Sequence, residues 1–219
     1  MYIHAASSWE QADEAFESFV AGLPERRREL AERVAASGGP SLDLSVESLG
    51  GLNAWFIDEV LRVPEPAEVD YRSPWLPPSN PDYHWEPGKL RPVPAWLLLL
   101  WDQVTAYVGD VMMAQVPGAR WVCWRAKHPG DITNGMPVVD IGVPVRPFVA
   151  TACANAGVPG LWTARGVPGR DGQPDSTRQL DHFRATLAGR ETYLATHPAR
   201  WQSAPTGPRA RRSQATPPG

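Results

Sequence analysis

The sequence predicts an α+β fold, a helix-rich single domain with a small antiparallel β-hairpin packed on a central helix. The segment 96–101 is apolar on all sides, which is typical of a buried helix. Residues 120–125 alternate like a strand, and the tight-turn pair Asn134-Gly135 precedes a second strand over 138–141. Because 219 residues suit one core, we expect residues 1–197 to form a single domain.

The N-terminal segment predicts a short helix over residues 9–21. Ser8 followed by Gln11 is typical of a capped helix start, and apolar side chains then recur at helical spacing. These side chains are Trp9, Ala12, Phe16 and Phe19. Because proline disrupts a helix interior but suits a first turn, we expect Pro24 to begin a separate helix over residues 24–37.

A third helix is predicted to start at Ser45, which suits the cap position, and to run to about Arg62. Its apolar stripe consists of Leu49, Leu52 and Phe56. The glycines Gly50 and Gly51 inside this helix each cost about 1 kcal/mol relative to alanine. We therefore expect the backbone there to pack closely against a neighbour.

Residues 63–94 show neither helical nor strand periodicity and contain nine prolines. Five aromatic or histidine side chains stand among the prolines, namely Tyr71, Trp75, Tyr83, His84 and Trp85. A segment this rich in proline is neither a helix nor a central strand, and its large rings favour burial. We expect an ordered aromatic insert over the domain, which is either a binding surface for a partner or a flap covering the core.

The central helix is predicted over residues 95–115, because Pro94 suits its first turn and Pro117-Gly118 breaks it. Two aspartates lie on its less apolar side, Asp102 and Asp110. Paired carboxylates can perform acid–base catalysis, but a spacing of eight residues gives about 12 Å of helical rise, too far for a cooperating pair. We expect Asp110 instead to bind the turn at 118–120 or to pair with Arg120.

The C-terminal part predicts two more helices and a tail. Pro147 suits the first turn of a helix over 147–157, and Ser176 with Gln179 is typical of a capping box for the last helix. Residues 198–219 are rich in Pro, Ser, Thr and Arg, so we expect a disordered tail.

Charge and hydropathy disfavour several classes of partner. The net charge is −3, and the four arginines after His197 have no acidic residue among them, which leaves −7 for residues 1–197. An acidic body disfavours nucleic-acid binding, which relies on neutralising phosphates. The longest apolar run, 93–101, is short of the roughly 20 residues that span a bilayer. The N-terminus shows no secretory signal pattern, so we expect a cytoplasmic protein.

The sequence predicts no cofactor and no metal centre. Cys123 and Cys153 do not make up a disulfide framework or a zinc set, and we interpret both as small buried hydrophobes. His128, Asp131 and Asp140 surround the hairpin, as a metal site or a His–carboxylate pair would require. Their spacing matches no ligand motif, and the Pro-Gly between the first two favours a solvated turn.

Three pieces of the chain stand out, namely Ser45–Leu49 with Leu52 and Trp55, Tyr107–Val111, and Gly118–Trp121. They resemble a loose group of actinobacterial proteins of unknown function found among immunity-like and defence-associated genes. In that group a helix ending in a Tyr-x-Gly-acid pattern precedes a strand with Trp, a second strand and a Pro-Phe helix, as over residues 40–155 here. The resemblance implies this order of elements and an immunity-like role, and it implies no catalytic residue.

We predict a non-enzymatic interaction factor that binds another protein through the aromatic insert, with an immunity- or defence-associated role. This hypothesis rests on the insert, the acidic body and the absence of nucleophile, phosphate-loop or metal motifs. The alternative is an enzyme or small-molecule-binding protein with a pocket between the central helix and the hairpin. That pocket would be lined by Asp110, Trp121, His128 and Asp140.

Overall fold

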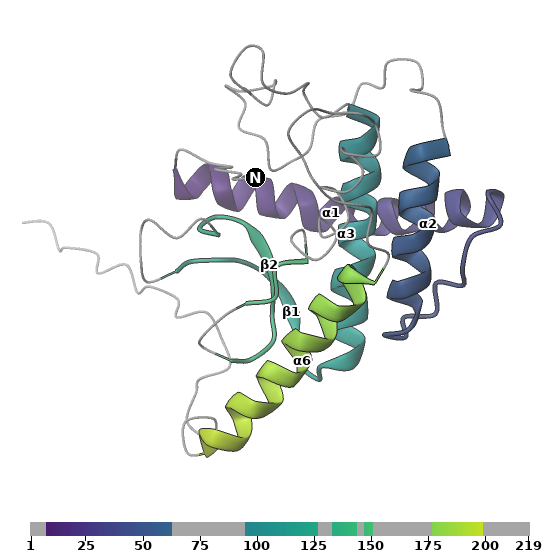
Figure 1. Ribbon diagram of the computed structural model, residues 1–219. Coiled ribbons are helices and arrows are strands. Elements are labelled where there is room, and N and C mark those ends of the chain that lie inside the picture. Colours follow the sequence, from purple (N-terminus) through teal and green to yellow (C-terminus); the bar gives the residue numbers. More distant parts are fainter. Residues whose placement is uncertain (1–7, 63–94, 127–132, 144–146, 151–176, 199–219) are drawn as a thin grey trace, which may run out of the picture.

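The computed structural model describes residues 8–62, 95–126, 133–143, 147–150 and 177–198 (Figure 1). The elements in chain order are α1 (Trp9–Ala36), α2 (Ser48–Arg62), α3 (Ala95–Gln115), β1 (Arg120–Cys123), β2 (Pro137–Asp140) and α6 (Arg178–Thr196). Helices predominate and the two strands pair antiparallel, which confirms the α+β class. The predicted insert 63–94 and tail residues 199–219 lie outside the described part.

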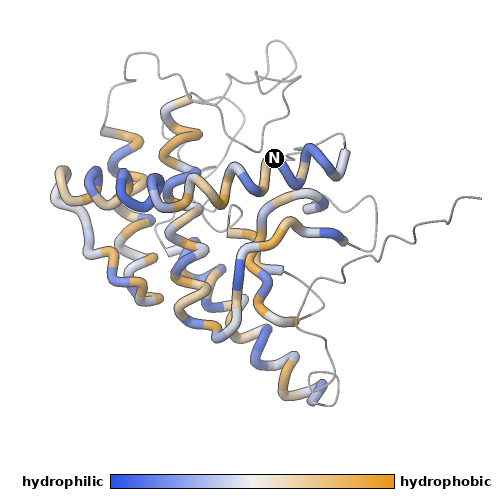
Figure 2. The backbone as a smooth tube through the Cα atoms, turned by 180° about the vertical axis from the view of Figure 1, so that it is seen from behind, coloured by the Kyte–Doolittle hydropathy of each residue, from blue (hydrophilic) through white to orange (hydrophobic). Residues whose placement is uncertain are grey.

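The helices form layers around α3. Helices α2 and α3 lie side by side and antiparallel, α1 crosses behind them, and α6 lies on the opposite side from α1 (Figure 1). Seen from behind, α1 runs across the molecule and carries hydrophilic residues along much of its length (Figure 2). The hairpin packs against α1 and α3, so the predicted arrangement of a hairpin on a central helix is confirmed.

The core is centred on α3, whose predicted bounds of 95–115 are confirmed. Its buried residues join those of α2, the C-terminal half of α1 and β2 in one apolar cluster. Phe19 and Leu23 of α1 form a second, smaller cluster with Ala106 of α3. Among the described helices, none is apolar over a stretch long enough to cross a bilayer.

Helix α1 is continuous from Trp9 to Ala36, so the predicted break at Pro24 is wrong. A proline inside a helix removes one hydrogen bond and costs about 3 kcal/mol. Leu23 and Leu30 are buried on either side of Pro24, and this burial favours one continuous helix. In addition, Arg26 Nη1 donates to the carbonyl of Phe19 at 3.1 Å, which adds a hydrogen bond in the turn before the proline.

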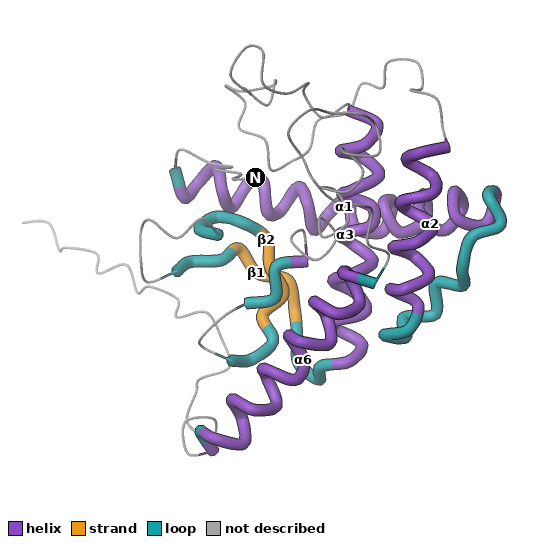
Figure 3. The backbone as a smooth tube through the Cα atoms, viewed as in Figure 1, coloured by secondary structure: helices purple, strands orange, loops and turns teal. Residues whose placement is uncertain are grey.

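Strand β1 ends two residues earlier than predicted, and β2 begins and ends one residue earlier than the predicted 138–141 (Figure 3). The register of the hairpin pairs Arg120 with Asp140 and Cys123 with Pro137. Beyond the strands, Trp124 N–H donates to the carbonyl of Met136 at 2.9 Å, and Gly135 N–H donates to that of Trp124 at 2.9 Å. The expected tight turn at Asn134-Gly135 is present, and Gly135 has a φ of 76°, in the region that favours glycine.

Phe148 extends the hairpin instead of starting a helix, so the predicted helix start at Pro147 is wrong. Phe148 and Val139 exchange two backbone hydrogen bonds of 2.9 Å each in an isolated antiparallel bridge. The Phe148 ring is buried and packs edge-on against Phe183 of α6, with centroids 5.4 Å apart. Ala150 is helical, and residues 151–157 of the predicted helix lie outside the described part.

Two predictions on helix starts have different outcomes. Ser45 Oγ accepts a hydrogen bond from Ser48 N at 3.1 Å, which confirms the cap at the start of α2. Helix α6 follows Thr177, whose side chain makes no capping hydrogen bond, and Ser176 of the predicted capping box lies outside the described part. The tight packing predicted for the paired glycines holds at Gly51, where a Cβ would lie 3.0 Å from the Pro40 ring.

Candidate functional site

Helix α3 joins the three motif pieces physically. Tyr107 lies on the face of α3 toward α2, and its hydroxyl accepts a hydrogen bond from Leu44 N at 3.0 Å. The same hydroxyl lies 2.7 Å from Ser48 Oγ, in a buried contact. Leu44 has a φ of 61°, in the left-handed region that a leucine rarely adopts, so Tyr107 fixes a strained loop. The first and second motif pieces are therefore held together by this tyrosine.

Gly109 joins the second piece to the third. The indole ring of Trp121 lies against the backbone of Gly109, and a Cβ built there would overlap the ring. The indole also packs edge-on against the Phe19 ring of α1, with ring centroids 4.9 Å apart. The Trp121 ring thus fills the space between α1, α3 and β1.

Asp110 pairs with Arg27 of α1 and not, as predicted, with Arg120 or the turn at 118–120. The pair was missed because no local pattern indicates that α1 crosses α3 at this level. Burial raises the pKa of the Asp110 carboxyl, although the neighbouring Arg27 guanidinium opposes the shift. Asp110 is therefore a structural ion-pair partner in a desolvated position.

Two residues of the hypothetical pocket, Trp121 and Asp140, lie on opposite faces of the hairpin. Strand side chains alternate between faces, so Trp121 and its partner Val139 lie on one face of the hairpin and Asp140 lies on the other. Asp140 faces Arg120 across the ladder, with N–O at 3.7 Å, and its Oδ1 accepts from Gly142 N at 2.9 Å. His128 lies outside the described part. The site as a whole, which includes His128, therefore stays a prediction.

The residues proposed for partner binding, Tyr71, Trp75, Tyr83, His84 and Trp85, also lie outside the described part. Within the described ranges, no group of three or more His, Cys, Asp or Glu side chains could hold a metal ion.

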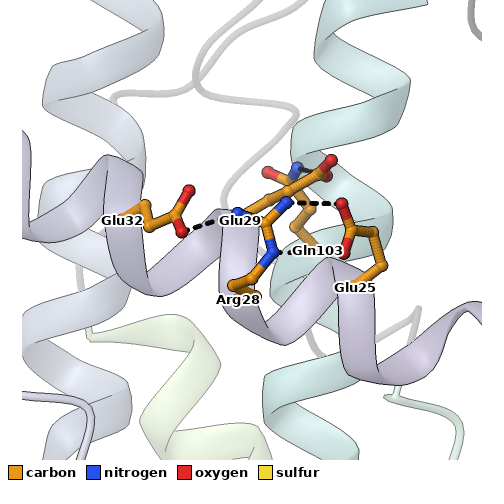
Figure 4. A network of polar contacts seen from close by, with 5 residues as sticks. All are labelled: Glu25, Arg28, Glu29, Glu32 and Gln103. Atoms are coloured by element: carbon orange, nitrogen blue, oxygen red, sulfur yellow. Dashed lines mark hydrogen bonds and ion pairs between the residues drawn. The ribbon is translucent and has the colours of Figure 1, made fainter.

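The outer face of α1 carries a network of charged side chains, as Figure 4 shows. Arg28 bridges Glu25 and Glu32, with its Nη1 at 2.6 Å from Glu32 Oε1. Exposed pairs of this kind contribute about 0–1 kcal/mol each. Gln103 of α3, which is buried, donates to Glu29 Oε2 at 2.7 Å and links this face to the core. Nothing in the sequence pattern marked Gln103 as the contact between these helices.

A second cluster, formed by Trp9, Asp13 and Arg125, connects the N-terminal part of α1 to the chain that follows β1. The Arg125 guanidinium lies 4.4 Å above the ring centroid of Trp9, which is exposed, and contacts both carboxyl oxygens of Asp13 at 2.6 and 2.8 Å. Cys123 is half-buried beside this cluster. Burial, with a smaller effect of Asp13, raises the pKa of its thiol to about 11, so it is a poor nucleophile.

An open groove lies where α1 ends beside α2. Its volume is about 750 Å³, and its lining consists of Ser37, Gly38, Gly39, Pro40, Trp55, Asp58, Glu59 and Leu61. Trp55 Nε1 donates to Ser37 Oγ at 2.7 Å, which fixes the indole against the loop after α1. A Cβ at Gly39 would lie 2.8 Å from Trp55 Cδ1, so this glycine allows the close approach. The sequence predicted the end of a helix at residue 37 but not the groove beside it.

Comparisons with known proteins were made at three levels, and no family model, curated protein or solved structure matches this chain.

Proposed function

We propose that this protein is a non-enzymatic interaction factor that binds another protein through the aromatic insert at 63–94. The resemblance of the three motif pieces favours an immunity- or defence-associated role. The proposal is supported by where the insert is attached: α2 ends at Arg62, α3 begins at Ala95, and these ends lie at the same end of the helix pair (Figure 1). Loops anchored in this way on a rigid scaffold commonly carry binding residues.

The scaffold that holds the two ends is well packed. Val60 of α2 and both Trp96 and Leu97 of α3 are buried within the core next to the ends of the insert. A rigid attachment lowers the entropy lost on binding, and the insert's prolines act in the same direction. Its tryptophans and tyrosines are residue types that dominate binding energy at protein interfaces.

The test compares partner capture with stability. Full-length protein is immobilised and exposed to a lysate of the source cells, alongside a Trp75→Ala/Trp85→Ala variant and a Trp9→Ala control from the exposed start of α1. We expect a protein retained by the wild type and the control to be lost with the double variant. The melting temperature of the double variant should stay within about 2 °C of the wild type. A large fall in melting temperature would mean instead that the insert belongs to the core.

A further inference from the structure

We infer that the groove between the end of α1 and α2 binds an arginine side chain on a segment of the partner protein. This inference rests on the proposed interaction function and adds a second, chemically defined contact. The groove adjoins the insert in the chain, because Leu61 lines it and α2 ends at Arg62. A partner held by the insert would therefore lie close to it.

The loop side of the groove has no free hydrogen-bond donor on its fixed backbone. The three N–H groups of this loop all donate to carbonyl oxygens in the last turn of α1. Ser37 N–H donates to Arg33 at 3.2 Å, Gly38 N–H to Ala35 at 3.1 Å, and Gly39 N–H to Val34 at 2.8 Å. Pro40 has no N–H. What this edge can offer a ligand is therefore carbonyl oxygens, which are acceptors.

The side-chain donors along the groove are engaged as well. Trp55 Nε1 donates to Ser37 Oγ, and the Ser37 hydroxyl in turn donates to the carbonyl of Arg33 at 2.9 Å. The carboxylate of Asp58 is an acceptor. A ligand of this groove must therefore supply the donors itself, which disfavours anions and carbonyl-rich ligands.

The electrostatic potential of the groove also favours a positively charged ligand. Helix α1 has 28 residues, and its C-terminal end carries the negative pole of the helix dipole at the groove's edge. Asp58 is exposed and has no ion-pair partner within the described part of the chain. Together these groups favour a cation.

The walls distinguish arginine from lysine. The exposed side chain of Leu61 and the small exposed part of the Trp55 indole give the groove apolar surface next to the Asp58 carboxylate. A guanidinium is planar and weakly hydrated, so it can lie on an indole while donating several hydrogen bonds, whereas an ammonium group is compact and strongly hydrated. Arginine thus matches both the acceptors and the apolar wall.

The experiment uses full-length protein and a fluorescein-labelled hexapeptide with two adjacent arginines flanked by leucines, followed by fluorescence anisotropy. We expect saturable binding that weakens with added salt and falls about tenfold or more when citrulline replaces arginine. Equal binding of the citrulline peptide, or no saturable binding, would overturn the inference.

Asp58→Asn should weaken binding about tenfold, because it removes the charge and keeps the shape of an exposed side chain. The matched control is Glu191→Gln on α6, which removes the same charge from another exposed site and should bind like the wild type. In NMR spectra, the indole N–H resonance of Trp55, assigned with Trp55→Phe, should shift on titration. Equal weakening by both variants would show unspecific attraction and overturn the inference.

The chain's own arginine-rich tail is the competing occupant. A full-length variant with Arg200, Arg209, Arg211 and Arg212 changed to Gln should bind the peptide as the wild type does. Clearly tighter binding would assign the groove to the tail instead. These readouts use a peptide and not the captured partner, so the two proposals can fail separately. Loss of peptide binding would not affect the capture test of the insert, and failure of the capture test would not affect the peptide result.

Discussion

The indole of Trp121 lies so close to Gly109 that no side chain fits between the β1 strand and helix α3 at this level. The contact links two motif pieces that are separated by a helix end and a turn. It also sets how near the hairpin approaches the central helix.

Gly109→Ala is therefore expected to destabilise the protein. A Cβ would overlap the ring, and overpacking of this kind costs roughly 1–3 kcal/mol, more than the helix propensity that alanine gains. The matched control is Gly189→Ala in α6, where a Cβ would meet no atom within 4 Å and should add about 0.5–1 kcal/mol of stability. Urea unfolding measures both changes. An unchanged or raised stability of Gly109→Ala would contradict the packing.

Tyr107→Phe should lower the free energy of unfolding by roughly 1–3 kcal/mol, because Leu44 N–H and Ser48 Oγ both lose their contact with the hydroxyl. Tyr193→Phe is the control, since the ring that stacks on His197 is kept. Thermal and urea unfolding should show the loss at Tyr107 alone. Equal effects of the two variants would argue against the role of the hydroxyl.

Asp110 gives a pH dependence of defined sign. Burial raises the pKa of this carboxyl in the folded state above the ordinary value of 3.8, which applies to the unfolded state. At a pH between the unfolded-state pKa and the folded-state pKa, the folded protein therefore binds more protons than the unfolded protein. This carboxyl therefore lowers stability as pH rises through that window. The wild type should lose stability relative to Asp110→Asn as pH increases from about 3.8. An opposite slope would mean that the Arg27 pair outweighs burial.

Cys123 should react slowly with iodoacetamide. A thiol pKa of about 11 in place of 9.0 reduces the thiolate fraction at pH 8 about 100-fold. The measurement uses a Cys153→Ser background, with the urea-unfolded protein as the reference for an ordinary thiol. Alkylation of the folded protein at the rate of the unfolded one would contradict the burial of this thiol.

The sequence predicted best those elements that local pattern determines. The bounds of α3 followed from an all-round apolar run between prolines, and the turn at Asn134-Gly135 followed from the conformations that glycine allows. The cap by Ser45 was likewise a local feature. Each of these involves residues within a few positions of each other in the chain.

Predictions failed where distant residues decide the outcome. Pro24 does not break α1, because Leu23 and Leu30 are buried by other parts of the fold. Phe148 forms a bridge to Val139 instead of starting a helix, because the edge of β2 offers backbone partners that the local sequence cannot reveal. The Arg27–Asp110 pair joins residues 83 positions apart, and the groove arises only when α1 and α2 meet.

The unbroken course of α1 has a consequence for how the molecule unfolds. The N-terminal half of this helix packs on the hairpin through Phe19, and its C-terminal half packs on α2 and α3 through Leu30 and Val34. Fraying of either region would have to loosen the same helix, so the two regions form one cooperative unit. Amide hydrogen exchange should consequently give the same free energy of opening for the slowest-exchanging amides in both halves of α1.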